Sequence, residues 1–531
     1  MSEGKAGIGR AAFGVALIVA LIIGAAGGYY GGISTVAPGV TTVTVTAPSK
    51  IVIGVTDKVS DLDPSNAYDF YTWEVLTNVM EGLMKYVPGT TTLELGIAQS
   101  YSVSEDGTVY TFKLKPGLRF ADGKPADANN VAWSVNRAMT INGDPGWLVV
   151  DFLQSVEAID AETVKFTLSK PVAYFLSLVA TPPYFTVHPS YNPEAYESDQ
   201  TAGGLGPYRI ARWERDVQLV LEANPYYYGG APKTNTLIIR FFATASAMRL
   251  ALEAGEIDIA WRTLTPTDVR DLKAKADLQV QEVPGAYIRY IIINENIPPF
   301  DNVLVRQALA AAVDRGTIAE KVFLGTVQPL YSMVPIGMWS HTDAFKDKFG
   351  ERDLELAKNL LKQAGYSETK KLTFDLWYTP THYGDTEADV ALILKEDWEE
   401  TGMIAVELKT AEWATYLDQT RAVTYPVCLY GWYPDYIDPD DYTTPWVDQA
   451  WTGRAYKNPT LSEILDAASV AQTVEERTQL YEQAQDIWAD DAAVIPLFQG
   501  SLTVVSKGNV RGIYLDPVML FRYWLVYFAP A

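Results

Sequence analysis

The sequence has little of the chemistry on which enzymes and metalloproteins usually depend. A single cysteine, Cys428, excludes an internal disulfide, and the only histidines, His188, His341 and His382, are not at metal-ligand spacing from one another. There is no GxSxG elbow, no P-loop and no GxGxxG after a predicted strand. Ser367-Glu368-Thr369-Lys370 fits SxxK, but no KTG follows, so we interpret it as a chance match in a polar loop. The sequence therefore predicts no catalytic, cofactor-binding or metal-binding residue.

Positive charge is also scarce. The chain has 42 basic and 65 acidic residues and a net charge of -23. Residues 1–49 carry Glu3, Lys5 and Arg10, or +1, so the rest of the chain carries -24. Such an acidic surface excludes nucleic-acid binding, which needs a basic footprint. Solubility is its simplest explanation, and a preference for cationic ligands is the alternative.

No charged residue occurs between Ala11 and Ser49, and this sets the expected compartment. Residues 11–30 are apolar and, at about 20 residues, long enough to cross a bilayer as a helix. Because Lys5 and Arg10 precede this run, the large domain is expected outside the cytoplasm. We predict an N-terminal membrane anchor or signal helix over residues 1–33 and a Thr/Pro-rich stalk over 34–49. A tether is favoured over a cleaved signal, since no cysteine is available for a lipid anchor.

The 531 residues exceed what one core usually holds, so two or three domains are expected. Predicted strands cover 51–55, 109–114, 163–168, 217–221, 237–242, 287–293, 372–378, 404–408 and 427–431. Predicted helices cover 71–86, a segment capped by Asp127, 301–323 capped by Asp301, 353–364, 386–402 with a Thr386/Asp389 capping box, and 473–488. In the later half strands and helices alternate, which favours an α/β lobe with a largely parallel sheet.

One segment combines aromatic and acidic residues directly after a predicted strand. Residues 429–446 read LYGWYPDYIDPDDYTTPW, and ligands of open α/β sheets bind beyond the carboxyl ends of strands. Aromatic walls with carboxylates suit a ligand with an ammonium group and apolar side chains, or equally a sugar. Trp432 and Asp435 are the strongest candidates for ligand contact. Asp440 and Asp441 are expected to be turn or cap residues.

Several segments, in this order, resemble one known family. They are residues 62–86, 105–139, 204–230, 248–261, 294–325, 355–366, 431–442 and 481–498. The stretch 105–139, EDGTVYTFKLKPGLRFADGKPADANNVAWSVNRAM, and the segment GWYPDYIDPDDY at 431–442 are the most distinctive. Together they are similar to the family-5 extracellular solute-binding proteins, which serve peptide and related ABC importers.

The resemblance implies an α/β, two-lobed periplasmic-binding-protein-like fold of type II, with an extra subdomain and a hinge between the lobes. Lobe I would comprise residues 50–286 plus 499–531, with the subdomain at 80–195, and lobe II residues 287–498. The chain would cross between them near 286–289 and 495–498. It would be a monomer that works with the permease subunits of an ABC transporter in the membrane.

The implied function is capture of oligopeptides or dipeptides by lobe closure. In peptide-binding members an aspartate three residues after the Gly-Trp tryptophan receives the α-ammonium, which places that role on Asp435. Gly431, Trp432 and Tyr433 would line the same site. Two alternatives remain open: the same fold binding oligosaccharides, and an extracellular hydrolase.

Overall fold

The computed structural model describes residues 50–531 except 381, 385, 449–454, 519 and 531. The anchor or signal helix expected at 1–33 and the stalk expected at 34–49 lie outside the described residues. Among the helices that are described, none is both long and apolar enough to span a membrane.

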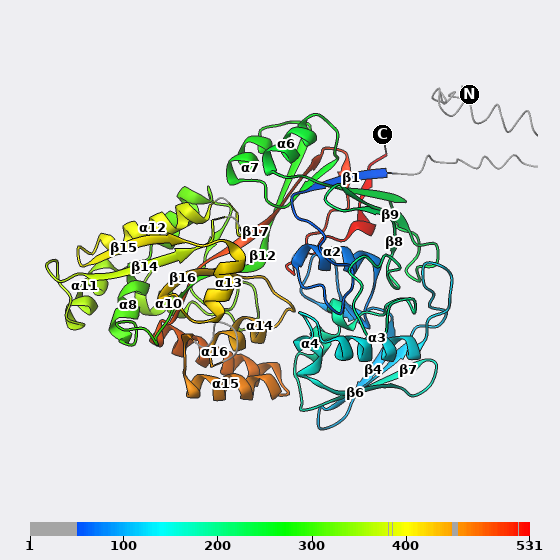
Figure 1. Cartoon of the computed structure of the whole chain (residues 1–531), viewed down its shortest axis with the longest axis horizontal. Helices are drawn as coiled ribbons and strands as arrows, with labels where there is room; N and C mark the ends of the chain where they lie inside the picture. The colour runs from blue at the N-terminus through cyan, green and yellow to red at the C-terminus, as the bar shows by residue number, and fades with distance from the viewer. Residues whose placement is uncertain (1–49, 381, 385, 449–454, 519, 531) are drawn as a thin grey trace, which may run out of the picture. The chain divides into compact units, whose positions relative to one another are not determined.

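One large mixed sheet runs through the described chain (Figure 1). Its strand order is β15-β14-β16-β12-β17-β11-β1-β10-β9-β8, and β13 pairs with β17. The bounds are β1 Lys50–Val55, β8 Tyr208–Glu214, β9 Gln218–Ala223, β10 Thr236–Phe241, β11 Ile259–Trp261, β12 Leu278–Ile293, β13 Gln328–Pro329, β14 Leu372–Tyr378, β15 Ile404–Thr410, β16 Val427–Trp432 and β17 Val494–Lys507. The predicted strands in this sheet are therefore confirmed, with β12 extending well before residue 287.

Two hydrophobic cores lie on either side of the β12–β17 pair. The first is built from residues between Ile51 and Trp261 and from the tail beyond Leu502, and the second from residues between Ala286 and Phe498. Each core also takes a tyrosine from the opposite part of the chain, since Tyr86 packs in the second core and Tyr436 in the first. The two parts are therefore interlocked by side chains as well as by the shared strands.

Helices belong to both parts of the chain: the first part, which precedes β12 and includes the C-terminal tail, and the second part, which runs from β12 to the start of β17. Those of the first part and its tail are α2 Phe70–Val79, α3 Ala128–Ile141, α4 Trp147–Val150, α5 Phe175–Leu178, α6 Ala245–Glu253 and α7 Pro266–Lys273. Those of the second part are α8 Val303–Ala312, α9 Arg315–Thr317, α10 Ala344–Phe349, α11 Leu354–Gln363, α12 Glu387–Glu399, α13 Trp413–Arg421, α14 Pro439–Thr443, α15 Pro459–Val470 and α16 Val474–Asp491.

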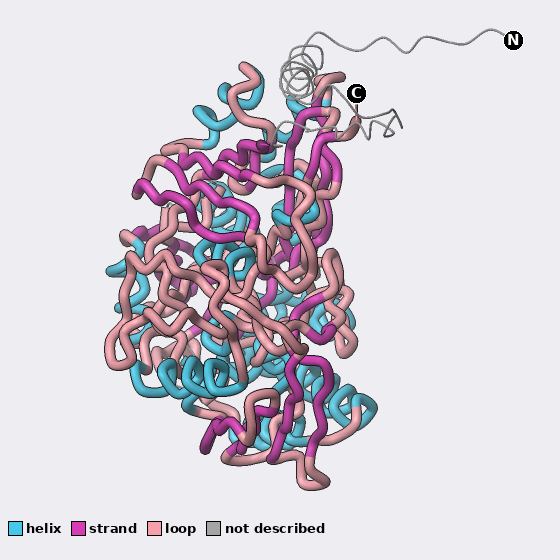
Figure 2. Tube along the Cα trace, turned by 90° about the vertical axis from the view of Figure 1, so that its right-hand side faces the viewer, coloured by secondary structure: helices cyan, strands magenta, loops and turns pink. Residues whose placement is uncertain are grey.

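A separate four-stranded antiparallel sheet lies at the lower end of the first part (Figure 1 and Figure 2). Its order is β4-β5-β7-β6, with bounds Ala98–Val103, Val109–Leu114, Thr163–Leu168 and Leu153–Ala158. Helix α3 packs on β6 and β7, and Asp127 caps it as predicted, since the Asp127 side chain accepts from the backbone N–H groups of Asn129 and Asn130. The small remaining strands are β2 Met84–Tyr86, β3 Leu93–Leu95, β18 Val510–Arg511 and β19 Tyr527–Phe528.

The helix predicted at 71–86 is too long. Helix α2 ends at Val79 because Met80 is extended, with φ -131° and ψ 169°, and the chain then forms β2. Gly82 makes this departure possible, because a Cβ there would lie 2.7 Å from the Val179 carbonyl oxygen. The apolar residues after Met80 therefore belong to a strand and a close backbone crossing, a tertiary contact that helical periodicity does not reveal.

Two further helix predictions are wrong in detail. Asn302, not Asp301, caps α8, and the helix stops at Ala312 because Val313 is extended, so the predicted 301–323 helix is broken. Thr386 occupies the N-cap position of α12 but makes no side-chain cap bond, which contradicts the predicted capping box. The predicted largely parallel sheet is mixed: β14 is parallel to β15 and β16, but β12 runs antiparallel to both β16 and β17.

Near the crossing between the two cores, the side chain of Tyr287 on β12 lies directly against Gly500 of β17. The register shifts between Pro284 and Ile288, and the ring of Tyr287 lies against the Cα of Gly500. A Cβ on Gly500 would be 1.6 Å from Cζ of Tyr287, so no side chain can be accommodated without moving that ring. Tyr287 in turn stacks on Tyr433, with ring centroids 5.2 Å apart.

We expect Gly500→Ala to destabilise the protein by about 1–3 kcal/mol, the usual cost of overpacking, because Tyr287 must leave its position. Urea unfolding followed by tryptophan fluorescence measures this. Gly316→Ala is the matched control, since the nearest atom to its added Cβ is 3.4 Å away. Equal stabilities for the two variants would contradict the close packing at Gly500.

Candidate functional site

The loop after β16 is organised by a buried aspartate. Asp441 is only 1% exposed, and its Oδ2 accepts hydrogen bonds from Nε1 of Trp432 at 3.0 Å and from the backbone N–H of Asp435 at 3.1 Å. These two bonds fix the end of strand β16 against the first turn of α14. Asp441 is thus more than the turn or cap residue that the sequence suggests: Asp438 is the cap of α14, and Asp441 holds Trp432 and Asp435 together.

Asp435 forms a hydrogen bond with a residue from the first part of the chain. The hydroxyl of Tyr68 donates to its Oδ2 at 2.7 Å, and the side chain stays half-buried. Burial and the negative charge of Asp435 raise the pKa of Tyr68, so this tyrosine remains a hydrogen-bond donor. A contact between residues 367 positions apart therefore joins the two parts of the chain at the carboxylate.

Among the residues that the structure describes, neither carboxylate has a cationic partner. Burial raises the pKa of both Asp435 and Asp441, and the charge of Asp435 raises that of Asp441 further. Oδ1 of Asp441 is buried without a hydrogen-bond partner. No Lys, Arg or His side chain of the described residues is among the main influences on the pKa of Asp435 or of Asp441. The arrangement favours an incoming cation with several N–H donors, such as an ammonium group.

Aromatic rings from both parts flank Asp435. Tyr433 packs between Phe70, at 5.6 Å between centroids, and Tyr287. Tyr436 stacks on Tyr174 at 5.1 Å and 12° between planes. The residues before and after Asp435 in the chain thus contribute aromatic surface close to a carboxylate, a combination that suits a ligand with both a charge and hydrocarbon surface.

A buried ion pair stabilises the loop that follows β16. Arg477 of α16 donates to both oxygens of Asp438, at 2.9 and 2.6 Å, and to the carbonyl of Ala468. Asp440 accepts from the hydroxyl of Tyr436 at 3.1 Å. Because both members of the Arg477–Asp438 pair are buried and paired with each other, this network fixes the loop without neutralising Asp435 or Asp441.

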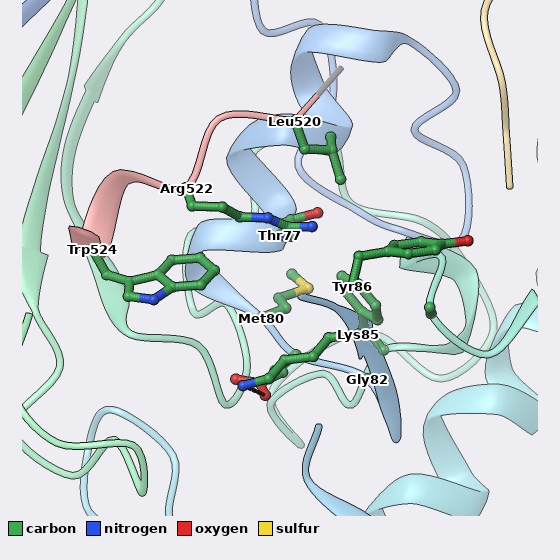
Figure 3. A pocket seen from close by; sticks show the side chains of 11 residues that line it. Thr77, Met80, Gly82, Lys85, Tyr86, Leu520, Arg522 and Trp524 are labelled. Carbon is green, nitrogen blue, oxygen red and sulfur yellow. Dashed lines mark ion pairs between the residues drawn. The ribbon is translucent and has the colours of Figure 1, made fainter. Parts of the chain in front are cut away.

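Two hollows lie away from this loop and are lined by other residues. In the first part, side chains from α2, β2 and the C-terminal tail surround a pocket of about 20 Å³, among them Met80, Lys85, Arg522 and Trp524 (Figure 3). This volume suits a water molecule rather than a ligand. In the second part, Trp377 stacks on Tyr425 at 4.3 Å in an open groove of about 620 Å³. Within the described ranges, no group of three or more potential ligands can hold a metal ion.

Residues 92–454, more than half of the chain, match the family described as bacterial extracellular solute-binding proteins, family 5, middle. The chain belongs to this family.

Several known proteins are similar to it along most of their length. The probable D,D-dipeptide-binding periplasmic protein DdpA of Escherichia coli K12 is 28% identical over 487 residues, covering 88% of this chain and 92% of that protein. Heme-binding protein A of Haemophilus influenzae is 29% identical over 475 residues, covering 83% of this chain and 85% of that protein.

The structure of the periplasmic binding protein DppA from Helicobacter pylori, in complex with peptide STSA, is similar with a TM-score of 0.77 and 25% identity. The match covers 91% of this chain and 99% of that one. That of CtaP from Listeria monocytogenes has a TM-score of 0.81, 25% identity and 91% and 100% coverage. The predicted two-lobed α/β fold of periplasmic binding proteins is confirmed.

All four residues chosen from the sequence lie in one strand end and loop, at 431–435. Sequence reasoning missed Tyr68, Phe70 and Tyr287, because these come from distant segments that the fold brings to Tyr433 and Asp435. The aromatic run Tyr68, Phe70, Tyr71, Trp73 at the start of α2 was the available signal for the first two. Nothing in the sequence pairs that run with the 431–435 segment.

We expect Asp441→Asn to remove a pH dependence of stability. A carboxyl whose pKa is raised on folding destabilises the native state as pH rises above the ordinary carboxyl pKa of about 4. The asparagine oxygen still accepts from Trp432 and Asp435 but carries no charge. The free energy of unfolding of the variant, relative to the parent, should therefore increase by about 1 kcal/mol or more from about pH 5 to about pH 8.

Urea denaturation at the two pH values gives this difference. Asp347→Asn, at an exposed position on α10, is the control and should show no such change. A difference that stays constant with pH would mean that Asp441 is not forced into a charged, buried state at neutral pH.

Proposed function

We propose that this protein is the extracytoplasmic receptor of an ABC importer and captures peptides with a free N-terminus. The observation that carries the proposal is Asp435, half-buried beside the deeply buried Asp441, without a cationic partner, and bonded to Tyr68 of the other lobe. An ammonium group would supply the missing charge and donate up to three hydrogen bonds. Gly431, Trp432 and Tyr433 would form the wall along the ligand backbone.

The similar proteins support peptides over the two alternatives drawn from the sequence. Their names include D,D-dipeptide-binding, dipeptide-binding, di/tripeptide-binding and oligopeptide-binding proteins, and one solved structure holds the peptide STSA. An oligosaccharide would leave the carboxylate pair without a counter-charge. A hydrolase is disfavoured because this is a family of solute-binding proteins.

Lobe closure would couple capture to delivery. We take residues 50–286 plus 499–531 as lobe I, with 80–195 as its extra subdomain, and 287–498 as lobe II. Tyr68 and Phe70 on one side and Asp435 and Tyr433 on the other would then meet only in the closed state. A ligand held by both lobes favours closure by its differential affinity for that state.

The charge-free N-terminal run supports an extracytoplasmic location. We propose that residues 1–33 act as a leader or membrane anchor, with 34–49 as a stalk, and that the binding domain works as a monomer with permease subunits in the membrane. Mass spectrometry of the intact purified protein distinguishes a cleaved leader from a retained anchor.

Titration of ligand-free protein with tri-alanine and with N-acetyl-tri-alanine, followed by tryptophan fluorescence or calorimetry, tests the ligand class. We expect tri-alanine to bind and N-acetylation to weaken binding by about 2 kcal/mol or more, since a buried charge pair is lost. Asp435→Asn should weaken tri-alanine to a similar degree, whereas the exposed Asp347→Asn should not. Binding of malto- or cello-oligosaccharides alone, or release of cleaved product, would overturn the proposal.

A further inference from the structure

A stack of three aromatic rings borders the groove of about 620 Å³ in the second part of the chain. Trp377 of β14 stacks on Tyr425, with ring centroids 4.3 Å apart and 19° between planes. Tyr425 in turn packs against Tyr416 at 5.3 Å. Tyr416 and Tyr425 are buried, whereas Trp377 is half-buried. Trp377 is therefore the ring of the stack that offers most surface to the groove.

Buried hydrogen bonds fix this stack in place. The hydroxyl of Tyr416 donates to the backbone oxygens of Trp377 on β14, at 3.1 Å, and of Leu429 on β16, at 2.6 Å. Asn294, which is 1% exposed, donates from Nδ2 to the carbonyl oxygen of Tyr425 at 3.3 Å. Because the rings are held from the protein interior, the indole surface is formed before any ligand arrives, and binding to it needs little ordering.

Polar side chains form the rim of the groove. They supply two carboxylates, one amide and three hydroxyl groups, from Asp375, Glu412, Gln419, Thr410, Thr415 and Thr424. Asp375 lies two residues before Trp377 on β14, and so on the same face of the sheet. Glu412, Thr415 and Gln419 follow one another by three and four residues, so they lie along one side of α13. A strand and a helix thus place hydrogen-bonding groups on different sides of one indole ring.

The carboxylates of the rim differ from the pair after β16, because they keep access to water. Asp375 is half-buried and Glu412 is exposed. The hydrogen bond to Glu407 raises the pKa of the neighbouring Lys409, and the charge of Asp375 adds to this rise, so Asp375 already lies near a positive charge. Neither rim carboxylate therefore needs a cation to offset burial, and a neutral ligand with many hydrogen-bonding groups suits the groove better.

A sugar ring has the matching chemistry. Its faces carry C–H groups that can lie on an indole, and its edge carries hydroxyl groups that both donate and accept. Carboxylates accept from such hydroxyls, while threonine hydroxyls and a glutamine amide can do either. The volume of the groove is within the range of small-molecule sites, roughly 300–1,000 Å³.

The groove is separate from the loop that carries Asp435. Tyr425 and Pro426 lie just before the start of β16, and Trp432 lies at its end. The six residues of this strand, Val427–Trp432, span roughly 20 Å. A ligand in the groove would therefore leave the loop after β16 free.

We propose that the groove beside Trp377 and Tyr425 is a second binding site, which takes a neutral saccharide. Trp377 would carry one face of a sugar ring, and the rim formed by β14 and α13 would bind its hydroxyl groups. This site does not rest on the proposed capture of peptides. It would let the receptor hold a saccharide while its peptide site stays available.

Saturation-transfer NMR on the full protein tests the site, with maltotriose, cellotriose and tri-N-acetylchitotriose as separate probes. Each is measured with and without excess tri-alanine. We expect at least one of the three to bind, and tri-alanine to leave its signal unchanged. A signal that tri-alanine abolishes would place the sugar in the peptide site and overturn the groove, as would failure of all three to bind.

Variants locate the saccharide. Trp377→Ala should weaken its binding at least tenfold, and Asp375→Asn severalfold. Trp339→Ala is the matched control, since this tryptophan is 40% exposed and does not line the groove. If Trp377→Ala fails to fold, as judged by circular dichroism, Glu412→Gln/Thr415→Ala replaces it, because both positions are exposed. Unchanged saccharide binding in a folded groove variant overturns the proposal.

Spermidine tests a cation as the occupant instead. Saccharide affinity should change less than about twofold between about 50 and 500 mM sodium chloride, because no charges are paired, whereas salt would weaken a cation held by carboxylates. Spermidine binding that Trp377→Ala removes, with none of the saccharides binding, would make the groove a cation site and overturn the proposal. Failure of tri-alanine to bind bears on the proposed function alone.

Discussion

The antiparallel pairing of β12 with β17 is the constraint on which the rest of the structure depends. Their register runs from Leu278 opposite Lys507 to Ile292 opposite Val494, so both strands pass from one hydrophobic core to the other. The site is assembled from the strands that this pair aligns: β16 pairs with β12 and carries Gly431 and Trp432, while β11 pairs with β17 and ends before Arg262. Because β-sheet register determines which side chains face each other, the crossing strands set the positions of residues that are far apart in sequence.

Buried charges in this protein fall into two kinds, and the difference bears on function. The pairs Arg137–Asp63 and Arg477–Asp438 are buried and bidentate, with further backbone acceptors on each arginine. Their cost of desolvation is offset by complete hydrogen bonding. Asp441, Arg289 and Arg262 each retain one buried polar atom without a partner. Native proteins rarely leave such atoms unmatched. Asp441 is bonded to Trp432, Arg289 lies opposite Gly431 in the sheet, and Arg262 lies over Phe70, so all three border the loop after β16 or its aromatic neighbours.

The sequence predicted local structure well where local chemistry decides it. Asp127 and Asp353 cap their helices as expected because an aspartate before an amphipathic run needs no distant partner. Predictions failed where tertiary contacts decide: the segment after Met80 leaves the helix because Gly82 packs against Val179, and β12 reverses the expected parallel order. At the site, the loop of residues 431–435 was found from its composition. Its partners Tyr68, Tyr287 and Arg289 were not, since only the sheet register brings them there.

The charges at the site also bear on what controls closure. Burial raises the pKa of both Asp435 and Asp441, and the hydrogen bond from Tyr68 opposes that rise at Asp435. The raised pKa of each group expresses the cost of burying its charged form without a cation. In the proposed function an ammonium group would remove that cost only with the two parts together, because Tyr68 and Phe70 come before β12 in the chain and Asp435 and Tyr433 come after it. Such a ligand would bind the closed state more tightly than the open one, and only this difference in affinity could shift the equilibrium toward closure. A neutral ligand of the same shape would lack the charge contribution to that difference, so the carboxylate pair would favour a charged ligand by making closure more favourable when the charge is present.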